Sequence, residues 1–267
     1  MEKQRITVLM AIYNCAATLD AALQSLINQT YKNWICILCD DASTDDTYLT
    51  AKKYADRYSE HFLLIKNVQN KGLNFTLNRC LEYAETEYVA RMDGDDISLP
   101  DRFEREIDFL DNNREFDIVS CPMIQFDENG DFRTGKAVEI PTKQQVVTKS
   151  VICHAPSMIR TKAIKAINGY TVSEKVLRVE DVDLWIRLYA NGSRCYNIQT
   201  PLYKMRDDRN ATSRRKFKYR INSTRVRLNG CKLHNLGFKY KMMCFRPIII
   251  GLLPKPIYRF LHKKQRG

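Results

Sequence analysis

The stretch ITVLMAIYN at residues 6–14 is a short apolar run that ends in a polar residue, and it predicts a buried β-strand. A second apolar run, WICILC at residues 34–39, follows after apolar residues at helical spacing. This alternation of strand-like and helix-like segments continues to residue 121. It indicates an α/β fold with a Rossmann-like, mostly parallel sheet and helices on both faces.

Further segments extend the pattern. Strands are expected at 62–65, 88–92 and 118–121, and helices near 48–55, at 75–83, from Pro100 to Leu110 and at 180–192. Residues 122–180 are less regular. Parallel sheets bind ligands beyond the carboxyl ends of their strands, so polar clusters at those ends are candidate sites. The chain has no GxGxxG after the first strand and no GxxxxGK[ST], which argues against a dinucleotide-binding domain and a P-loop.

The composition is that of a globular protein. The 267 residues are 44% hydrophobic and 28% charged, which excludes a disordered chain, a collagen and a coiled coil. The nine cysteines are scattered, and the N-terminus lacks the apolar run of a secretory signal, so we expect reduced thiols in the cytoplasm. Cys36 and Cys39 form a CxxC within a strand-like run, but no second pair completes a zinc site. Core thiols are therefore their expected role.

The charge is unevenly distributed along the chain. Residues 201–267 hold 19 Lys and Arg against 2 Asp and Glu, whereas residues 1–200 hold 24 basic and 29 acidic residues. A basic tail of this kind seeks phosphates, either on nucleic acid or on an anionic membrane surface.

Apolar residues accompany the basic ones in the tail. Phe217, Ile221 and Leu228 share one face of a helix expected within residues 212–236. The apolar run between Pro247 and Pro254 is far shorter than the ~20 residues that span a bilayer. A segment lying in the membrane interface is favoured over helices packed on the body with a solvated basic face.

The acidic run Asp93-Gly94-Asp95-Asp96 directly follows the fourth predicted strand. Its carboxylates repel one another unless they share a cation, and Asp oxygens suit Mg²⁺ or Mn²⁺ with room left for substrate phosphates. Gly94 removes a side chain that would block a bulky ligand. The alternative is a solvated turn, because Asp and Gly are common turn residues.

Two other acidic pairs admit two interpretations each. Asp40 and Asp41 end the second strand, where they would accept hydrogen bonds from a nucleotide base or ribose, or cap the next helix. Glu180 and Asp181 open a helix, as acids favoured by its dipole or as a general base for an incoming hydroxyl. His154 is expected to be a hydrogen-bonded structural residue, with a phosphate or metal role as the alternative.

Six stretches in order resemble the family 2 glycosyltransferases, from about residue 5 to about residue 206. They are VLMAIYN at 8–14, SLINQTY at 25–31, DDASTD at 40–45, NKG at 70–72, MDGDD at 92–96 and EDVDLW at 180–185. The resemblance implies the glycosyltransferase A fold, a nucleotide-sugar donor and inverting transfer to a hydroxyl. It also implies that Asp93 and Asp95 are the DxD pair, holding Mn²⁺ or Mg²⁺ on the donor diphosphate.

The resemblance implies further site residues. Asp181 matches the proposed base, with Glu180 beside it, while Ala11 and Tyr13 would flank the nucleotide base that Asp41 binds. The implied donor-binding set is Ala11, Tyr13, Asn14, Asp40, Asp41, Lys71, Asp93, Gly94 and Arg206. The chain departs from the family at Tyr203-Lys204-Met205-Arg206, where a Tyr-Arg-x-His motif often occurs, and Arg206 is the candidate for a diphosphate contact instead.

These implications define the expected protein. A catalytic domain that binds a nucleotide-sugar is expected at residues 1–205, followed by a basic amphipathic helical tail at 206–267. The enzyme would use a UDP-sugar and a polyprenyl-diphosphate-linked saccharide in surface polysaccharide synthesis, on the inner face of the cell membrane. The alternatives are a polyprenyl-phosphate glycosyltransferase of the same fold and a nucleic-acid-binding protein that uses the tail. The tail has no recognised nucleic-acid module, so no nucleic acid is expected as a partner.

Overall fold

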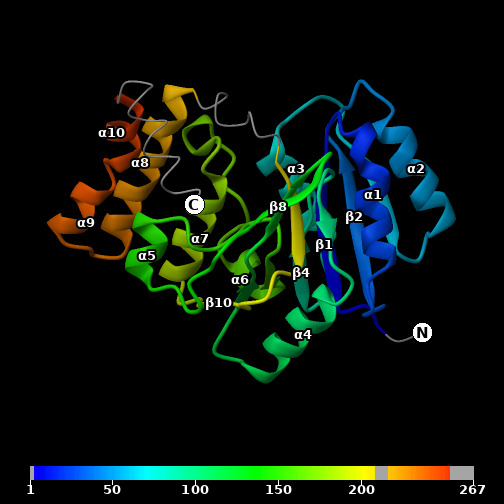
Figure 1. Cartoon of the computed structure of the whole chain (residues 1–267), viewed down its shortest axis with the longest axis horizontal. Helices are drawn as coiled ribbons and strands as arrows, with labels where there is room; N and C mark the ends of the chain where they lie inside the picture. The colour runs from blue at the N-terminus through cyan, green and yellow to red at the C-terminus, as the bar shows by residue number, and fades with distance from the viewer. Residues whose placement is uncertain (1–2, 208–215, 253–267) are drawn as a thin grey trace.

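The computed structural model describes residues 3–207 and 216–252 (Figure 1). A seven-stranded sheet forms its centre, in the order β10-β6-β9-β4-β1-β2-β3. Its strands are β1 (Ile6–Ile12), β2 (Trp34–Asp40), β3 (Phe62–Lys66), β4 (Tyr88–Arg91), β6 (Ile118–Ser120), β9 (Met158–Arg160) and β10 (Cys195–Asn197). All neighbours pair in parallel except β9, which runs antiparallel to both β4 and β6. The predicted α/β fold with a mostly parallel sheet is confirmed.

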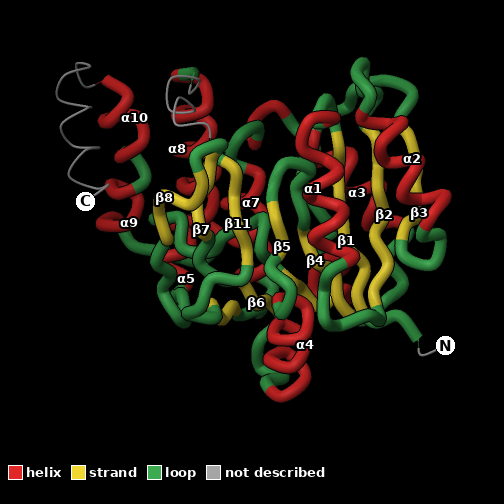
Figure 2. The backbone as a smooth tube through the Cα atoms, turned by 45° about the vertical axis from the view of Figure 1, so that its right-hand side comes forward, coloured by secondary structure: helices red, strands yellow, loops and turns green. Residues whose placement is uncertain are grey.

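Helices cover both faces of this sheet, as Figure 2 shows for α1 and α2 in front of β1 and β2. One apolar core joins the even-numbered residues of β1 to helices α1 (Ala16–Ile27), α2 (Thr47–Arg57) and α4 (Arg102–Asn112). The other core joins Leu9 and Val89 to helices α3 (Leu73–Glu82), α5 (Lys143–Thr148), α6 (Thr161–Ala166) and α7 (Glu180–Ala190). Because both faces of β1 are buried, its sequence is continuously apolar rather than alternating.

Cys36 and Cys39 lie on β2 and are fully buried, one in each core, so they point to opposite faces of the sheet. The prediction that they are core thiols is confirmed, and they cannot share a zinc ion in this arrangement.

A second, four-stranded sheet has the order β5-β11-β7-β8. Its strands are β5 (Ile97–Ser98), β7 (Ile124–Asp127), β8 (Gly130–Thr134) and β11 (Tyr203–Arg206). Much of it lies within residues 122–180, where the sequence predicts little regular structure. The strands are short and β8 is exposed along its whole length, so they lack the apolar runs that identify a buried strand.

The predicted helix at 180–192 is α7, which ends at Ala190, two residues before the glycine expected to stop it. Gly192 has a φ of +93°, and its N–H donates to Tyr189 O. The N–H of Ser193 donates to Leu188 O, which completes a Schellman motif. A short 3₁₀ helix, η1 (Glu174–Val176), precedes α7.

Three helices follow β11: α8 (Phe217–Leu233), α9 (Phe238–Met243) and α10 (Arg246–Leu252) (Figure 1). Helix α8 lies beside α7 and α5, α9 lies beside α5, and α10 packs on α8. Val226 and Cys231 of α8 belong to the same core as α7, so this core crosses the predicted boundary at 205/206. Phe217 and Ile221 of the predicted apolar face are instead 43% and 40% exposed. The boundary itself stays a prediction, and the parts of the tail at 208–215 and 253–267 lie outside the described residues.

No helix within 3–207 or 216–252 combines the length and the apolar character that crossing a bilayer requires.

Candidate functional site

The carboxyl ends of β2, β1 and β4 lie side by side at one edge of the central sheet, because these three strands are adjacent and parallel. The chain reverses its order here, with β2 on one side of β1 and β4 on the other, which is where sheets of this kind bind ligands. Three residues near this edge and the start of α7 have left-handed backbones: Asn14, Ala42 and Arg178, with φ of 47°, 60° and 65°. Such strain in residues other than glycine concentrates at functional sites.

We call residues 93–96 the acid loop. Asp93 Oδ1 lies 2.6 Å from Arg91 Nη2, and the Asp93 N–H donates to the Tyr203 hydroxyl at 3.2 Å. Asp96 is buried and accepts the N–H of Arg206 at 2.8 Å. The Asp95 carboxyl forms no ion pair with any residue of the described part of the chain. The loop therefore carries more negative charge than its protein partners neutralise.

Burial and, after it, the repulsion between the carboxylates shift the pKa values of the acid loop. Desolvation and the negative charge of Asp93 raise the pKa of Asp95. Burial, followed by the charges of Asp93 and Asp95, raises the pKa of Asp96 to about 8. A bound cation would relieve this repulsion.

The acid loop suits a cation shared with a ligand rather than one held by protein alone. Within 3–207 and 216–252, no three His, Cys, Asp or Glu side chains are placed to hold a metal ion together. Mg²⁺ in particular is commonly bound by one or two carboxylates, with substrate phosphates and water completing its shell. The unpaired carboxyl of Asp95 and the repulsion within the loop fit such a site.

Gly94 has a structural reason of its own. A Cβ at this position would lie 2.7 Å from Cys15 Sγ, closer than real Cβ atoms approach sulfur. The Gly94 carbonyl also accepts the Thr18 hydroxyl at 2.9 Å. The absent side chain thus lets the acid loop pack on the start of α1, whether or not a ligand also needs the space.

Asp41 fastens the segment 67–72 to the end of β2. Its carboxylate accepts Asn67 Nδ2 at 2.6 Å and the N–H groups of Lys71 and Gly72 at 2.8 Å each. Asp40 is fully buried, accepts the Ser43 N–H at 3.3 Å and lies 3.7 Å from Lys66 Nζ. Both carboxylates therefore organise loops at this edge, and their direct contact with a nucleotide stays a prediction.

The end of β1 presents an aromatic ring to solvent. Tyr13 is 48% exposed, and Ala11 lies half-buried two residues earlier. The side chain of Asn14 accepts the Thr44 N–H at 2.9 Å, so it ties this end of β1 to the loop after β2.

Arg206 reaches the acid loop from β11. Besides its N–H bond to Asp96, its Nε donates to the Asp95 carbonyl at 3.2 Å, and its guanidinium stacks over Phe126. The structure thus brings the sequence-predicted Arg206 to the acid loop from more than a hundred residues away.

Glu180 and Asp181 form the first turn of α7. Burial raises the pKa of both carboxyls, and Glu180 Oε2 is buried without a hydrogen-bond partner in the described structure. Burial raises the pKa of the Tyr170 hydroxyl, and the charges of Asp93 and Glu180 add to this effect against that of Arg91. The Tyr170 hydroxyl is therefore near both the acid loop and the first turn of α7.

His154 is fixed by neighbouring aromatic side chains. Its Nε2 lies 2.9 Å from the Tyr170 hydroxyl, and its ring packs edge-on against Tyr170 and Trp185. Burial, together with the charge of Arg91, lowers the pKa of His154 well below its ordinary value. This is the arrangement of a hydrogen-bonded structural residue.

Three residues at the site escape sequence reasoning: Arg91, Tyr170 and Tyr203. Arg91 interrupts the apolar strand YVARM, which is the one signal that could have identified it. Tyr170 and Tyr203 carry no such signal, since a tyrosine among apolar residues resembles any core aromatic.

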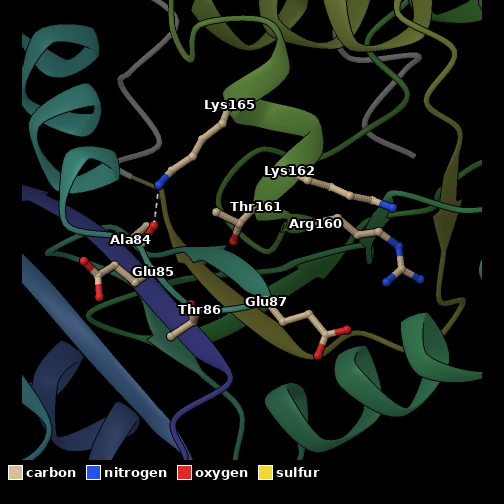
Figure 3. A pocket seen from close by; sticks show the side chains of 8 residues that line it. All are labelled: Ala84, Glu85, Thr86, Glu87, Arg160, Thr161, Lys162 and Lys165. Atoms are coloured by element: carbon tan, nitrogen blue, oxygen red, sulfur yellow. Dashed lines mark hydrogen bonds between the residues drawn. The ribbon is translucent and has the colours of Figure 1, made fainter.

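Two hollows described by the structure lie elsewhere. The first, of about 390 Å³, lies between the loop before β4 and the start of α6 and is lined by Glu87, Arg160, Thr161, Lys162 and neighbours (Figure 3). The second, of about 410 Å³, shares residues 85–87 with it and extends to Arg5. Both flank the amino end of β4, opposite the acid loop.

Comparison with known proteins gives a consistent result. Residues 7–167 match the family model described as Glycosyl transferase family 2. The chain is 38% identical over 261 residues to the putative glycosyltransferase EpsE of Bacillus subtilis, covering 98% of this chain and 94% of the relative. It is 27% identical over 261 residues to WfaP of Escherichia coli, a UDP-Glc:alpha-D-GlcNAc-diphosphoundecaprenol beta-1,3-glucosyltransferase, covering 97% and 98%.

Solved structures agree on the fold. S. aureus TarS 1–349 in complex with UDP-GlcNAc superposes with a TM-score of 0.72 at 19% identity, over 90% of this chain and 70% of that one. The mannosyltransferase PcManGT from Pyrobaculum calidifontis, in complex with GDP-Man and Mn²⁺, gives a TM-score of 0.60 at 16% identity, over 99% and 80%. The arrangement of this chain is the glycosyltransferase A fold.

Proposed function

The chain belongs to glycosyl transferase family 2, and from this premise we propose that it is an inverting, metal-dependent glycosyltransferase that uses a UDP-sugar. The acceptor in this proposal is a hydroxyl of a polyprenyl-diphosphate-linked saccharide, in surface polysaccharide synthesis. The observation that carries the proposal is the acid loop at the carboxyl edge of the sheet, where Asp95 has no ion pair among the described residues.

Similar proteins support the choice of donor and acceptor. The printed activity of WfaP joins a UDP-sugar to a diphosphoundecaprenol-linked GlcNAc, and a second Escherichia coli relative transfers galactose from UDP-Gal to the same kind of acceptor. TarS was solved with UDP-GlcNAc. A UDP-sugar and a lipid-linked sugar hydroxyl are therefore the substrates we expect.

On the donor side, Asp93 and Asp95 would hold Mn²⁺ or Mg²⁺. A cation there acts as a Lewis acid that stabilises the charge developing on the leaving diphosphate. Arg206 adds a fixed positive charge at the acid loop. The exposed ring of Tyr13, with Ala11 behind it, offers a surface on which the nucleotide base can stack.

On the acceptor side, Asp181 is the proposed general base. The acceptor oxygen forms a bond to the anomeric carbon as the bond from that carbon to the diphosphate oxygen breaks, and the acceptor proton passes to the Asp181 carboxylate. A base works best when its pKa is close to the working pH, and burial raises the pKa of Asp181 towards that range. Glu180 lies beside it with a buried, unpartnered oxygen.

A transfer assay tests this function. The purified chain is supplied with a panel of nucleotide sugars, a GlcNAc-diphosphoundecaprenol acceptor, and Mn²⁺ or EDTA. We expect Mn²⁺-dependent transfer from a UDP-sugar, and Asp181→Asn should lower kcat by at least about 100-fold. Full activity in EDTA would contradict the metal assignment. Full activity of the Asp181→Asn variant would favour the alternative of a polyprenyl phosphate acceptor, which needs no strong base.

We further propose that the tail places the enzyme on the anionic, cytoplasmic face of the membrane. Residues 216–252 contain nine Lys and Arg and no Asp or Glu. Helices α9 and α10 bury no side chain, and Phe238, Met242 and Ile249 are 76%, 53% and 57% exposed. Apolar side chains among basic ones suit the membrane interface, where each Lys or Arg contributes about 1 kcal/mol.

Vesicle sedimentation tests this placement. Binding to vesicles that contain phosphatidylglycerol should exceed binding to phosphatidylcholine vesicles, and Phe238→Ser with Met242→Ser should weaken it. Equal binding to both vesicle types would contradict the proposal. Salt-sensitive binding to DNA or RNA in place of vesicles would favour the nucleic-acid alternative.

A further inference from the structure

Arg91 is the last residue of β4 and stands two positions before Asp93. Its backbone is fixed on both sides, because its N–H donates to Ser157 O at 2.9 Å and its carbonyl accepts Arg102 Nη2 at 3.0 Å. These two bonds fix the position of the Arg91 Cα and Cβ atoms directly before the acid loop.

The side chain of Arg91 is only partly satisfied, although it is 4% exposed. Nη1 donates to the Met92 carbonyl, and Nη2 donates to Asp93 Oδ1 at 2.6 Å. Nε is buried without an acceptor among the residues described. The ion-pair partner of Arg91 is Asp93, whose side chain is 34% exposed at the surface of the site. A buried charge with so incomplete a set of partners lowers the stability of the folded protein.

Arg160 provides a comparison within the same sheet. It lies on β9, the neighbour of β4, and is 8% exposed. Its guanidinium donates to the carbonyls of Phe116 and Leu110 and to the Tyr88 hydroxyl, so it meets a full set of partners away from the acid loop. The contacts of Arg160 explain it as a structural residue. The guanidinium of Arg91, in contrast, forms its ion pair with Asp93 of the acid loop.

We infer that Arg91 is a positioning residue that fixes the carboxylate of Asp93 for the divalent cation. It occupies Oδ1 and leaves Oδ2 without a bond to the described residues, so one defined oxygen of Asp93 is available. Its buried positive charge also offsets the excess negative charge of the acid loop, on which a diphosphate has to bind. Residues that orient metal ligands in this way typically alter metal affinity by about 10- to 100-fold when removed. The inference rests on the proposed metal-dependent function.

Titration of Mn²⁺ into the full chain saturated with UDP, followed by electron paramagnetic resonance, tests the inference without using activity. We expect Arg91→Met to weaken Mn²⁺ binding by about tenfold or more. Arg91→Lys keeps a charge but not the forked pair of donors, and should weaken binding by about three- to tenfold. Arg91→Lys also tests the inference if the methionine variant does not fold.

Two further variants separate positioning from a general structural role. If Arg91 acts through Asp93, the double variant Arg91→Met with Asp93→Asn should bind Mn²⁺ as weakly as Asp93→Asn alone, rather than showing the product of both effects. Arg160→Met should lower Tm but leave Mn²⁺ binding within about twofold of wild type.

The outcomes distinguish this inference from the proposed function. Folded Arg91 variants that bind Mn²⁺ within twofold of wild type would overturn the inference alone, and so would multiplicative effects in the double variant. A wild-type chain that binds no Mn²⁺ in the presence of UDP would overturn both the inference and the metal assignment.

Discussion

Asp95 and Asp111 lie at opposite edges of the central sheet, and their carboxyl groups have pKa values shifted in opposite directions. Hydrogen bonds from Arg5 and Tyr88 and the charge of Arg5 lower the pKa of Asp111, against the effect of burial. Desolvation and the charge of Asp93 raise the pKa of Asp95. The two residues are chemically identical, so the difference comes from how far each is buried and from the partners that each one meets.

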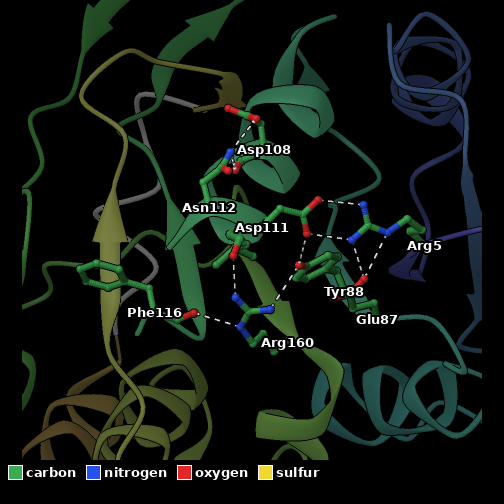
Figure 4. A network of polar contacts seen from close by, with 9 residues as sticks. Arg5, Glu87, Tyr88, Asp108, Asp111, Asn112, Phe116 and Arg160 are labelled. Carbon is green, nitrogen blue, oxygen red and sulfur yellow. Dashed lines mark hydrogen bonds and ion pairs between the residues drawn. The ribbon is translucent and has the colours of Figure 1, made fainter. Parts of the chain in front are cut away.

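The edge around Asp111 is a closed network (Figure 4). Arg5 donates to Asp111 at 2.7 and 2.8 Å and to Glu87 at 2.5 Å, and Tyr88 donates to Asp111 at 2.6 Å. Both carboxylates there contact the guanidinium of Arg5, as in a network that stabilises a fold. At the acid loop the negative charges exceed their partners. This is the difference expected if, as proposed, the acid loop gives up stability in order to bind a cation.

The largest effect should come from Asp95→Asn. We expect kcat/KM to fall by about 10³-fold or more, which corresponds to about 4 kcal/mol of transition-state stabilisation. Tm should stay unchanged or rise, because the substitution removes repulsion within the acid loop. Steady-state kinetics beside a thermal melt would measure both, and a large drop in Tm would break the comparison between the two edges.

The acid side of the pH–activity profile should expose the proposed base. Since burial raises the pKa of Asp181 and the base must be deprotonated, kcat should fall about tenfold per pH unit below that raised pKa. The fall should begin above the pKa of about 4 that is ordinary for Asp. A profile of the wild type that stays flat down to pH 4 would exclude Asp181 as the base.

Gly94→Ala should lower activity about tenfold, because the added Cβ meets Cys15 Sγ at 2.7 Å and displaces the acid loop. If that contact is the reason for the glycine, Cys15→Ala in the same chain should restore most of the activity. If the added methyl group instead obstructs the donor, the second substitution should restore nothing.

The smallest effect on activity should come from Asp111→Asn, which tests the other edge. Because Arg5 and Asp111 are both more than a third exposed in this network, we expect a loss of about 1 kcal/mol of stability and a Tm lower by about 2–4 °C. kcat/KM should stay within about twofold of wild type.

The pH dependence of that stability sharpens the test. The folded-state pKa of Asp111 is lowered, so its contribution is present above the unfolded pKa and is lost as pH falls through the folded pKa. The Tm difference between wild type and Asp111→Asn should therefore shrink in acid. A constant difference would show that Asp111 acts through something other than its charge.

The sequence predicts the first half of the molecule well for a physical reason. β1, β2 and β4 are buried on both faces, so they appear as continuous apolar runs, and the polar residues that follow them lie together at the carboxyl ends of these strands. This pattern and the family resemblance predict the acid loop, Asp41 and Arg206 as site residues, and the structure places the acid loop and Arg206 in contact.

The second half is harder to predict, since its elements depend on distant partners. β11 is a short strand whose place is set by pairing with β5 and β7, far away in the chain. α8 docks with polar groups, including Asn222 Nδ2 on the Glu174 carbonyl and Arg227 Nη1 on the Val147 carbonyl. The periodic pattern of apolar residues does not predict contacts of that kind, because they are made by polar groups.

The reversed direction of β9 has a consequence for how such enzymes can diversify. Because β9 runs against β4, residues 154–157 enter the sheet beside the acid loop, and the long excursion from 122 to 153 begins and ends near the same edge. The excursion is also tied to β11, because β7 pairs with that strand and Phe126 lies under the Arg206 guanidinium. If the proposed donor site is correct, a change of sequence in this one insertion would alter both the surroundings of Arg206 and the side of the site that faces the acceptor.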